Sequence, residues 1–403
     1  MTLNTTSSED RFAGERLKRT PFYPRLKELN LREAWDEWNG YKFADHFYDT
    51  DYEYFCIRNQ CGTYDITPMQ KHLIEGPDAE AMLNRMVTRD MTKLRVNRVT
   101  YLCWCDDGGR MIDDGTIFRL GEEKFMLTCG SPSNAWLAKS AVGFDNVTIT
   151  DITDDTAAIA FQGPVTCEVL KKMGLEGIEN LKRFGIMTFP FEGETMIVSR
   201  TGFTGDLGYE LWVPAELGLK MWDKLYAAGE DYGIQPVGEG AVNMARLEAG
   251  LIMPYLDFSE ALKTVHYKHD QSPLMLNIGF TVDFKKPHFN GREALLAEKE
   301  KGLDYILTKL DIEGNKVAEE AILYAEEECK TEIGYVTSAM WSPAVKANIA
   351  LAMVKPEYLE KEIWAEIYFY KELRPYRKMA ICTVRDKPFY MPPHASQTPP
   401  AIF

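Results

Sequence analysis

The pattern of apolar and polar positions divides the chain into a mixed core and a strand-rich C-terminal part. Apolar residues recur on one side of several segments, which is typical of helices packed on a core. These predicted helices span residues 78–94, 133–141, 165–173, 216–228 and 239–250. Shorter apolar runs predict strands over residues 99–105, 110–120, 124–129 and 157–161. Residues 304–385 hold closely spaced strand-like runs, which favours a small β-barrel or sandwich as a separate module.

A glycine-rich segment at residues 200–214 is the most distinctive local pattern, and it predicts a strand, a hairpin turn and a second strand. Glu210 begins the second strand, directly before three apolar residues. A carboxylate buried there needs a partner, because burial of an unpaired charge is costly. Arg246 on the predicted helix 239–250 is the natural countercharge. The alternative is a ligand that offers several N–H donors to Glu210.

A second acidic pattern lies in the predicted strand after the Gly108-Gly109 turn, where Asp113 and Asp114 are adjacent. Neighbouring residues of a strand point to opposite faces, so one carboxylate faces inward. An inward acid is a candidate general base or charge stabiliser. The alternative interpretation is a pair of solvated acids at a sheet edge.

Residues 21–60 are unusually rich in aromatic side chains, which suit either core packing or the wall of an apolar or cationic ligand site. They are Phe22, Tyr23, Trp35, Trp38, Tyr41, Phe43, Phe47, Tyr48, Tyr52, Tyr54 and Phe55. Residues 254–273 lack clear periodicity, and their histidines have no third metal ligand at an obvious spacing. We expect these loop histidines either to contact a substrate or to be merely exposed. The candidate substrate contacts are Trp38, Tyr41, Trp104, Tyr255 and His266.

Composition and charge exclude several classes of partner. The chain has 403 residues with 61 acidic and 46 basic side chains, a formal net charge of −15, so a nucleic-acid partner is not expected. No apolar run reaches membrane length, and the polar N-terminus does not resemble a signal peptide, so we expect a cytoplasmic protein without a membrane partner. Residues 1–20 are predicted to be a flexible leader and residues 391–403 a proline-rich tail.

The eight cysteines are too sparse for a disulfide framework, and Cys103 and Cys105 are better explained as buried strand residues than as metal ligands. Motifs for a bound dinucleotide, a nucleotide phosphate, a nucleophilic serine or zinc are missing from the sequence. An enzyme of this sequence is therefore expected to use a diffusible cofactor or an activated substrate.

Several short motifs together resemble the aminomethyltransferase family, in an order and spacing that are highly specific. They are residues 64–67, 107–109 with 113–114, 159–164, 201–210, 246–250, 289–295 and 337–343. The family includes the T-protein of the glycine cleavage system, the folate-binding domains of dimethylglycine and sarcosine dehydrogenases, and stand-alone folate-dependent demethylases. The resemblance extends from about Thr20 to the end of the chain.

The resemblance implies an α+β fold of interleaved subdomains around a central folate channel, followed by a C-terminal β-barrel. The core would span residues 21–290, with a second subdomain at roughly 63–156, and the barrel residues 304–390. Tetrahydrofolate is the implied one-carbon acceptor. By resemblance, Glu210 and Arg246 contact the pterin, Asp113 lies beside the reacting folate nitrogens, and Tyr101 and Phe203 belong to the folate site.

The chain departs from the T-protein pattern at positions on the donor side of the folate site, among them Thr67-Pro68-Met69, Cys129 and Phe203. The first hypothesis is therefore a demethylase that moves a methyl group from nitrogen, sulfur or oxygen of a small molecule to N5 of tetrahydrofolate. The alternatives are the glycine-cleavage aminomethyltransferase, which needs a lipoyl carrier protein, and a folate-binding regulatory protein.

Overall fold

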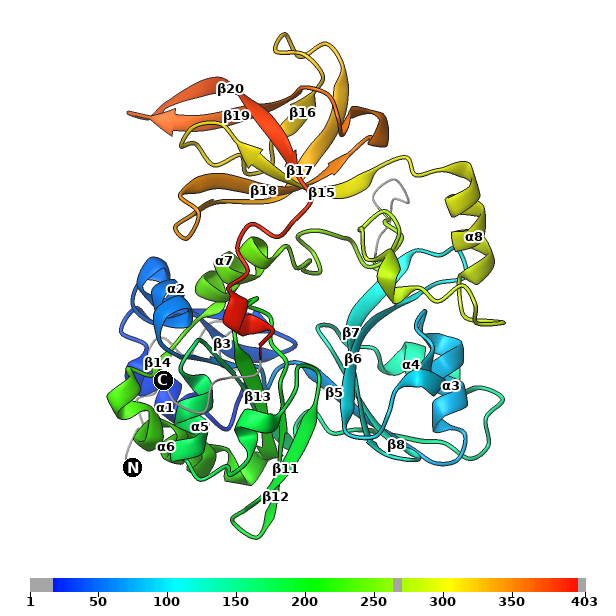
Figure 1. Cartoon of the computed structure of the whole chain (residues 1–403), viewed down its shortest axis with the longest axis vertical. Helices are drawn as coiled ribbons and strands as arrows, with labels where there is room; N and C mark the ends of the chain where they lie inside the picture. The colour runs from blue at the N-terminus through cyan, green and yellow to red at the C-terminus, as the bar shows by residue number, and fades with distance from the viewer. Residues whose placement is uncertain (1–16, 264–269, 398–403) are drawn as a thin grey trace, which may run out of the picture.

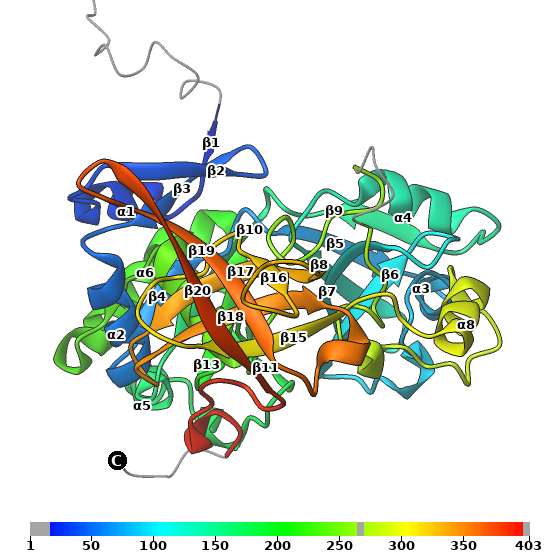
Figure 2. The ribbon, with the colours of Figure 1, turned by 90° about the horizontal axis from the view of Figure 1, so that it is seen from above.

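Two open sheets and a closed barrel form the framework of the protein in the computed structural model, which describes residues 17–263 and 270–397 (Figure 1). One sheet has six strands, the other has five, and six strands close the barrel. Figures 1 and 2 show the barrel above the junction of the two sheet units. This mixed architecture confirms the predicted α+β class with a C-terminal barrel.

The six-stranded sheet is covered by helices on both faces. In spatial order its strands are β11 (Ile186–Phe191), β12 (Glu194–Ser199), β13 (Gly208–Pro214), β10 (Thr156–Gln162), β4 (Gly62–Asp65) and β14 (Gln235–Pro236). The alternation along β10 explains the two faces: Ile159 and Phe161 pack towards α5 (Thr166–Lys172) and α6 (Gly218–Gly229). Ala158 and Ala160 face the other way, towards α2 (Thr50–Asn59) and α7 (Glu239–Ala249).

The five-stranded sheet carries its helices on one face. Its spatial order is β6 (Arg98–Cys105), β7 (Met111–Gly121), β8 (Lys124–Cys129), β5 (Gln70–Glu75) and β9 (Thr148–Asp151). The helices α3 (Ala79–Met86) and α4 (Asn134–Ala141) share a buried apolar cluster with these strands. The predicted helix 78–94 is thus interrupted, because Val87 is extended and forms a β-bridge with Trp104. A short 3-10 turn follows at Met91–Lys93.

The C-terminal barrel closes in the order β15 (Ile306–Ile312), β18 (Ala347–Val354), β17 (Glu332–Ser342), β16 (Ile322–Tyr324), β19 (Ile363–Lys371) and β20 (Arg374–Arg385). The strand-like runs of the sequence at residues 305–311, 332–339, 348–354, 364–369 and 379–385 match the other five strands. They miss β16, because three residues are too few to show an alternating pattern. The helix α8 (Arg292–Lys301) precedes the barrel.

The N-terminal aromatic segment forms α1 (Tyr23–Leu29), α2 and a small sheet of β1 (Lys18–Arg19), β3 (Tyr41–His46) and β2 (Ala34–Trp38). Phe22, Phe47 and Tyr54 are buried, as the core-packing interpretation predicts for aromatic residues. No helix within the described ranges is long and apolar enough to cross a membrane.

A buried ionic cluster joins α2 and α7 to the hairpin turn and to the barrel. Arg58 donates from Nη2 to Oε2 of Glu248 at 2.7 Å and from Nη1 to Oδ2 of Asp206 at 3.1 Å. The hydroxyl groups of Tyr54 and Ser342 donate to Oε1 of Glu248 at 2.7 and 2.5 Å. Both carboxylates are fully buried, and the Arg58 side chain is only 4% exposed. The single guanidinium therefore neutralises two desolvated acids from two different segments.

Replacement of Arg58 by methionine is expected to lower the free energy of unfolding by about 3–5 kcal/mol, because Glu248 would remain buried without a cation and Asp206 would keep, of its ion-pair contacts, the one with His394 Nε2 at 2.6 Å. Urea denaturation followed by circular dichroism measures this loss. Lys172→Met is the matched control, since Lys172 and Asp231 form an exposed ion pair at 2.7 Å whose removal should leave the urea midpoint unchanged. Equal losses in the two variants would contradict the central role of Arg58.

Candidate functional site

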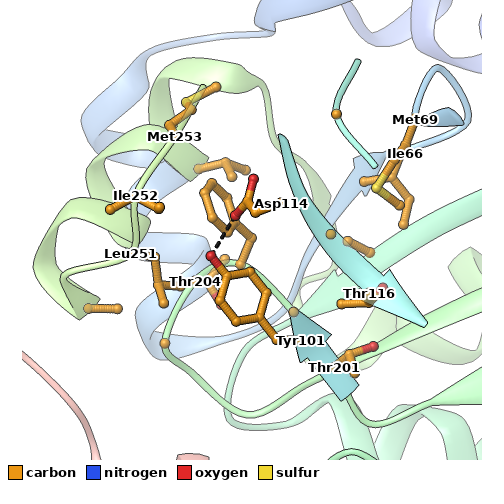
Figure 3. A pocket seen from close by; sticks show the side chains of 18 of the residues that line it. Ile66, Met69, Tyr101, Asp114, Thr116, Thr201, Thr204, Leu251, Ile252 and Met253 are labelled. Carbon is orange, nitrogen blue, oxygen red and sulfur yellow. Dashed lines mark hydrogen bonds between the residues drawn. The ribbon is translucent and has the colours of Figure 1, made fainter. Parts of the chain in front are cut away.

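A cavity of about 1340 Å³ lies where the two sheet units and the barrel meet (Figure 3). The six-stranded sheet contributes Ala160 and Glu210, the five-stranded sheet contributes Tyr101 and Asp114, and the barrel contributes Lys309. The segment after α7, from Leu251 to Met253, lines another part of the wall. Since each wall comes from a different part of the chain, the cavity exists only in the folded protein.

Glu210 lies in the cavity wall without a cationic partner among the described residues. The strand register places Glu210 beside Ser199 on β12 and Ala160 on β10. Its Oε2 atom accepts hydrogen bonds from Thr201 Oγ1 at 2.5 Å and from Ser199 Oγ at 3.3 Å. Burial raises the pKa of Glu210, and the two hydroxyl donors oppose that rise only in part. Within the described chain its Oε1 atom accepts no hydrogen bond, so it is available to a ligand with N–H donors.

The predicted ion pair between Glu210 and Arg246 is wrong. The Arg246 side chain is fully buried, and its Nη1 atom lies 2.5 Å from Oδ2 of Asp257. Its Nη2 atom donates to Ser338 Oγ on β17 at 2.8 Å, and Nε donates to Asn243 Oδ1 at 2.7 Å. Arg246 is also absent from the cavity lining. Its guanidinium thus fastens α7 to the barrel, and its predicted contact with a pterin is not tested by this geometry.

Asp113 and Asp114 of β7 point to opposite faces of the sheet, as strand alternation requires. Asp114 is the one that lines the cavity. Its Oδ2 atom accepts a hydrogen bond from the Tyr101 hydroxyl at 2.6 Å (Figure 3). Asp113 points to the other face and is 1% exposed. Its carboxylate accepts from the backbone N–H groups of Asp114 at 2.8 Å and Ser131 at 3.3 Å. The role predicted for Asp113, an acid beside the folate, is therefore better matched by the position of Asp114.

Burial shifts the pKa values of this pair in the same direction. Burial raises the pKa of Asp114 to about 6, although the hydrogen bond from Tyr101 opposes the rise. Burial and the charge of Asp114 raise the pKa of Asp113 well above its ordinary range. Burial next to Asp114 also raises the pKa of Tyr101, so this hydroxyl remains a donor. Both shifts favour the protonated forms, and the hydrogen bond from Tyr101 stabilises the charged form of Asp114 at the cavity surface.

A second group of cavity residues combines aromatic rings with the acid Glu239. The ring of Trp38 stacks on Tyr64 with a centroid distance of 6.4 Å and an interplanar angle of 19°, and Phe43 meets Trp38 edge-on at 6.0 Å. Trp38 donates from Nε1 to the carbonyl of Gly130 at 2.9 Å. The Tyr64 hydroxyl donates a short hydrogen bond to Oε2 of Glu239, the first residue of α7. All four side chains line the cavity.

The remaining predicted contacts have different positions. Phe203 and Tyr255 line the cavity and are 36% and 64% exposed. Tyr41 is buried outside the cavity lining, and its hydroxyl donates to Asp154. Trp104 is fully buried in the core of the five-stranded sheet, so its predicted substrate contact is wrong. His266 lies outside the described residues.

Sequence reasoning missed Tyr64 and Glu239 as cavity residues. Tyr64 belongs to a family motif, but no pattern assigns it to a site, and 175 positions separate it from Glu239. A glutamate at the start of a predicted helix is ordinary, since acids are favoured at helix N-termini. Their contact arises from tertiary packing alone. Over the described ranges, no three His, Cys, Asp or Glu side chains gather in a way that would hold a metal ion.

Comparison with known proteins agrees with this arrangement. The GCVT N-terminal domain model matches residues 24–286, and the model of the glycine cleavage T-protein C-terminal barrel domain matches residues 307–390. An aminomethyltransferase of Caldanaerobacter subterraneus is 32% identical over 86% of this chain and 90% of the relative. A trimethylamine-oxide aldolase of Ruegeria pomeroyi is 35% identical over 87% of this chain, but over only 44% of that longer protein.

The solved structures support the fold. The glycine cleavage system aminomethyltransferase T of Bartonella henselae superimposes with a TM-score of 0.81, covers 93% of this chain and 98% of its own, and is 24% identical in sequence. The matching domains and relatives together account for both sheet units and the barrel. The chain therefore belongs to the glycine cleavage T-protein (GCVT) family, and it is an enzyme of one-carbon transfer.

Proposed function

We propose that the protein is a tetrahydrofolate-dependent demethylase, which transfers a methyl group from a small N-, S- or O-methylated compound to tetrahydrofolate and releases 5-methyltetrahydrofolate. One observation carries the proposal: the cavity holds an acid suited to a pterin, Glu210, and a separate aromatic pocket at Trp38 and Tyr64. Two binding regions in one cavity suit the methyl acceptor, tetrahydrofolate, and a small methyl donor bound side by side.

Glu210 is suited to hold the pterin end of tetrahydrofolate. The pterin edge presents adjacent N–H groups, and a carboxylate accepts two such donors at once. The Oε2 atom of Glu210 already accepts from Thr201 and Ser199, which fixes the orientation of the carboxylate and leaves Oε1 towards the cavity. The buried carboxylate without a cation thus gains the donors that it lacks when the pterin binds.

Asp114 is suited to accept the proton that leaves N5 during transfer. Bound tetrahydrofolate supplies the nucleophile, N5, whose lone pair forms the new bond to carbon as the bond to the donor atom breaks. Tyr101 donates to Oδ2 of Asp114 and so orients the carboxylate while its other oxygen remains accessible. Alignment of the two bound molecules supplies much of the rate of such an in-line displacement.

The aminomethyltransferase of the glycine cleavage system is the second candidate function. It is supported by a named aminomethyltransferase that matches this chain over 90% of its own length. This reaction requires an aminomethylated lipoyl carrier protein and yields 5,10-methylenetetrahydrofolate and ammonia. The departures on the donor side, including Phe203 and Thr67-Pro68-Met69, favour a small free donor instead.

The products of a donor panel distinguish the two reactions. Purified protein with tetrahydrofolate and methylated amines, sulfonium compounds or methoxyaromatics is expected to form 5-methyltetrahydrofolate, measured by liquid chromatography with mass detection. The same assay with aminomethylated lipoyl protein is expected to give no 5,10-methylenetetrahydrofolate. If the methylene product forms and no panel member reacts, the protein is the aminomethyltransferase.

Replacement of Glu210 by glutamine is expected to weaken tetrahydrofolate binding about 10- to 100-fold, because charge-assisted hydrogen bonds to the pterin are lost. Isothermal titration calorimetry measures the affinity. Glu194→Gln is the matched control, since Glu194 lies at the exposed far end of the same hairpin strands and should bind folate as the wild type does. If Glu210→Gln binds tetrahydrofolate with unchanged affinity, Glu210 does not bind the pterin.

Asp114→Asn is expected to lower kcat by about 100-fold or more while the folate Kd changes little, because proton acceptance is lost but the pterin contacts remain. In the wild type kcat should fall as the pH drops below about 6, since Asp114 becomes protonated there. The Asn variant should lack that decline. Asp113→Asn is the comparison: a larger rate loss in this variant than in Asp114→Asn would return the role to Asp113.

A further inference from the structure

The chemistry of the donor can be read from the aromatic pocket, defined here as Trp38, Phe43, Tyr64 and Glu239. Its rings present π-faces and its acid presents a negative charge, a combination that attracts cations. We propose that the methyl donor is a small onium cation, a quaternary ammonium or sulfonium compound, held against Trp38 and Tyr64 with Glu239 as its counterion. This inference rests on the demethylase function and specifies its substrate class.

The charge of Glu239 is not neutralised by an ion pair within the described residues. Oε2 of Glu239 accepts from the Tyr64 hydroxyl, and its Oε1 atom has no partner there. The nearby guanidinium of Arg246 is already paired with Asp257 at 2.5 Å. Burial raises the pKa of Glu239, and the hydrogen bond from Tyr64 and the charge of Arg246 oppose that rise only in part. A bound cation stabilises the charged form of this carboxylate.

The cavity wall beside the pocket also carries negative charge. Asp36 and Glu37 line the cavity on β2, directly before Trp38, and both side chains are exposed. Within the described residues neither of them forms an ion pair. The basic residues that line the cavity lie on other segments; they are Arg89, Arg98, Arg183, Arg200 and Lys309. Arg89 donates to the carbonyl of Tyr101 at 2.8 Å, and Arg98 donates to that of Arg183 at 3.0 Å. The aromatic end of the cavity is thus anionic, and a cationic donor is attracted to it.

The sheet register places the pocket at a fixed separation from the pterin end. Tyr64 pairs with Ala160, and Ala160 pairs with Glu210, so the three residues form one row across the sheet with their side chains on the same face. Two strand spacings separate Tyr64 from Glu210, about 10 Å. The methyl side chain of Ala160 leaves the space between them open, which allows a donor at Tyr64 and a pterin at Glu210 to be bound side by side.

The reaction itself favours a cationic donor. When N5 attacks the methyl carbon, the carbon–nitrogen or carbon–sulfur bond breaks and its electron pair stays on the donor atom. An onium donor then leaves as a neutral amine or sulfide, and N5 releases its proton to Asp114, so charge and atoms balance. A methylated amine that stays unprotonated would leave as an unstable amide anion, whereas a donor nitrogen or sulfur that already carries a positive charge leaves as a neutral group.

Choline and its uncharged carbon analogue 3,3-dimethylbutan-1-ol test the proposal, because they differ in charge and hardly in shape. Isothermal titration calorimetry uses the full-length protein, alone and with 5-formyltetrahydrofolate, whose blocked N5 prevents turnover. Choline is expected to bind at least tenfold more tightly than the alcohol. A parallel titration with trimethylsulfonium shows which onium class is preferred.

Trp38→Leu and Glu239→Gln are each expected to weaken choline binding at least tenfold, while 5-formyltetrahydrofolate binds as in the wild type and so reports an intact fold. Glu293→Gln is the matched control, since Glu293 also lies in the first turn of a helix, α8, but is 85% exposed and outside the cavity. Its choline affinity should not change.

Equal affinities for choline and the alcohol, or no binding of any onium probe in either folate state, would overturn the onium proposal. Retained binding of 5-formyltetrahydrofolate in that case leaves the demethylase function standing with a donor of another class. Loss of folate binding by the wild type would instead remove the proposed function itself. The two failures are therefore separable in one set of titrations.

Discussion

The ion pair between Arg58 and Glu248 is the constraint on which the geometry of the cavity depends. Arg58 lies on α2, Glu248 lies at the end of α7, and both are removed from water. The same guanidinium donates to Asp206 and to the carbonyl of Thr204 in the hairpin turn, at 3.1 and 2.9 Å. Because a buried charge is stable only with its partners in place, these contacts fix the turn before Glu210 relative to α7.

The cavity separates two kinds of unsatisfied acid. Glu210 and Glu239 both lie in the wall without an ion-pair partner among the described residues, but their surroundings differ. Glu210 accepts from two hydroxyl groups, whereas Glu239 adjoins a stacked pair of aromatic rings. The first environment suits a ligand with N–H donors and the second suits a compact cation. Tyr64, Ala160 and Glu210 form a single row of the sheet, so alanine lies between the aromatic pair and Glu210 and keeps the two environments apart.

Membership of the GCVT family does not by itself set the reaction or the donor. Two relatives of similar identity to this chain, 32% and 35%, bear the names of different activities, an aminomethyltransferase and a trimethylamine-oxide aldolase. A shared fold does not set a shared reaction, since function resides in the side chains of the site. In this chain those side chains include Trp38, Tyr64 and Glu239 on the side opposite Glu210.

The sequence by itself determined many of the helices and strands after residue 78, the hairpin that carries Glu210, the C-terminal barrel and the family. Local periodicity and turn residues encode these features, so they can be read without a structure. The tertiary structure alone decided that Asp114 rather than Asp113 reaches the cavity, because alternation sets opposite faces but not which face is inward. It also decided that Arg246 pairs with Asp257 and that Tyr64 meets Glu239, since contacts between separate elements leave no periodic trace in the chain.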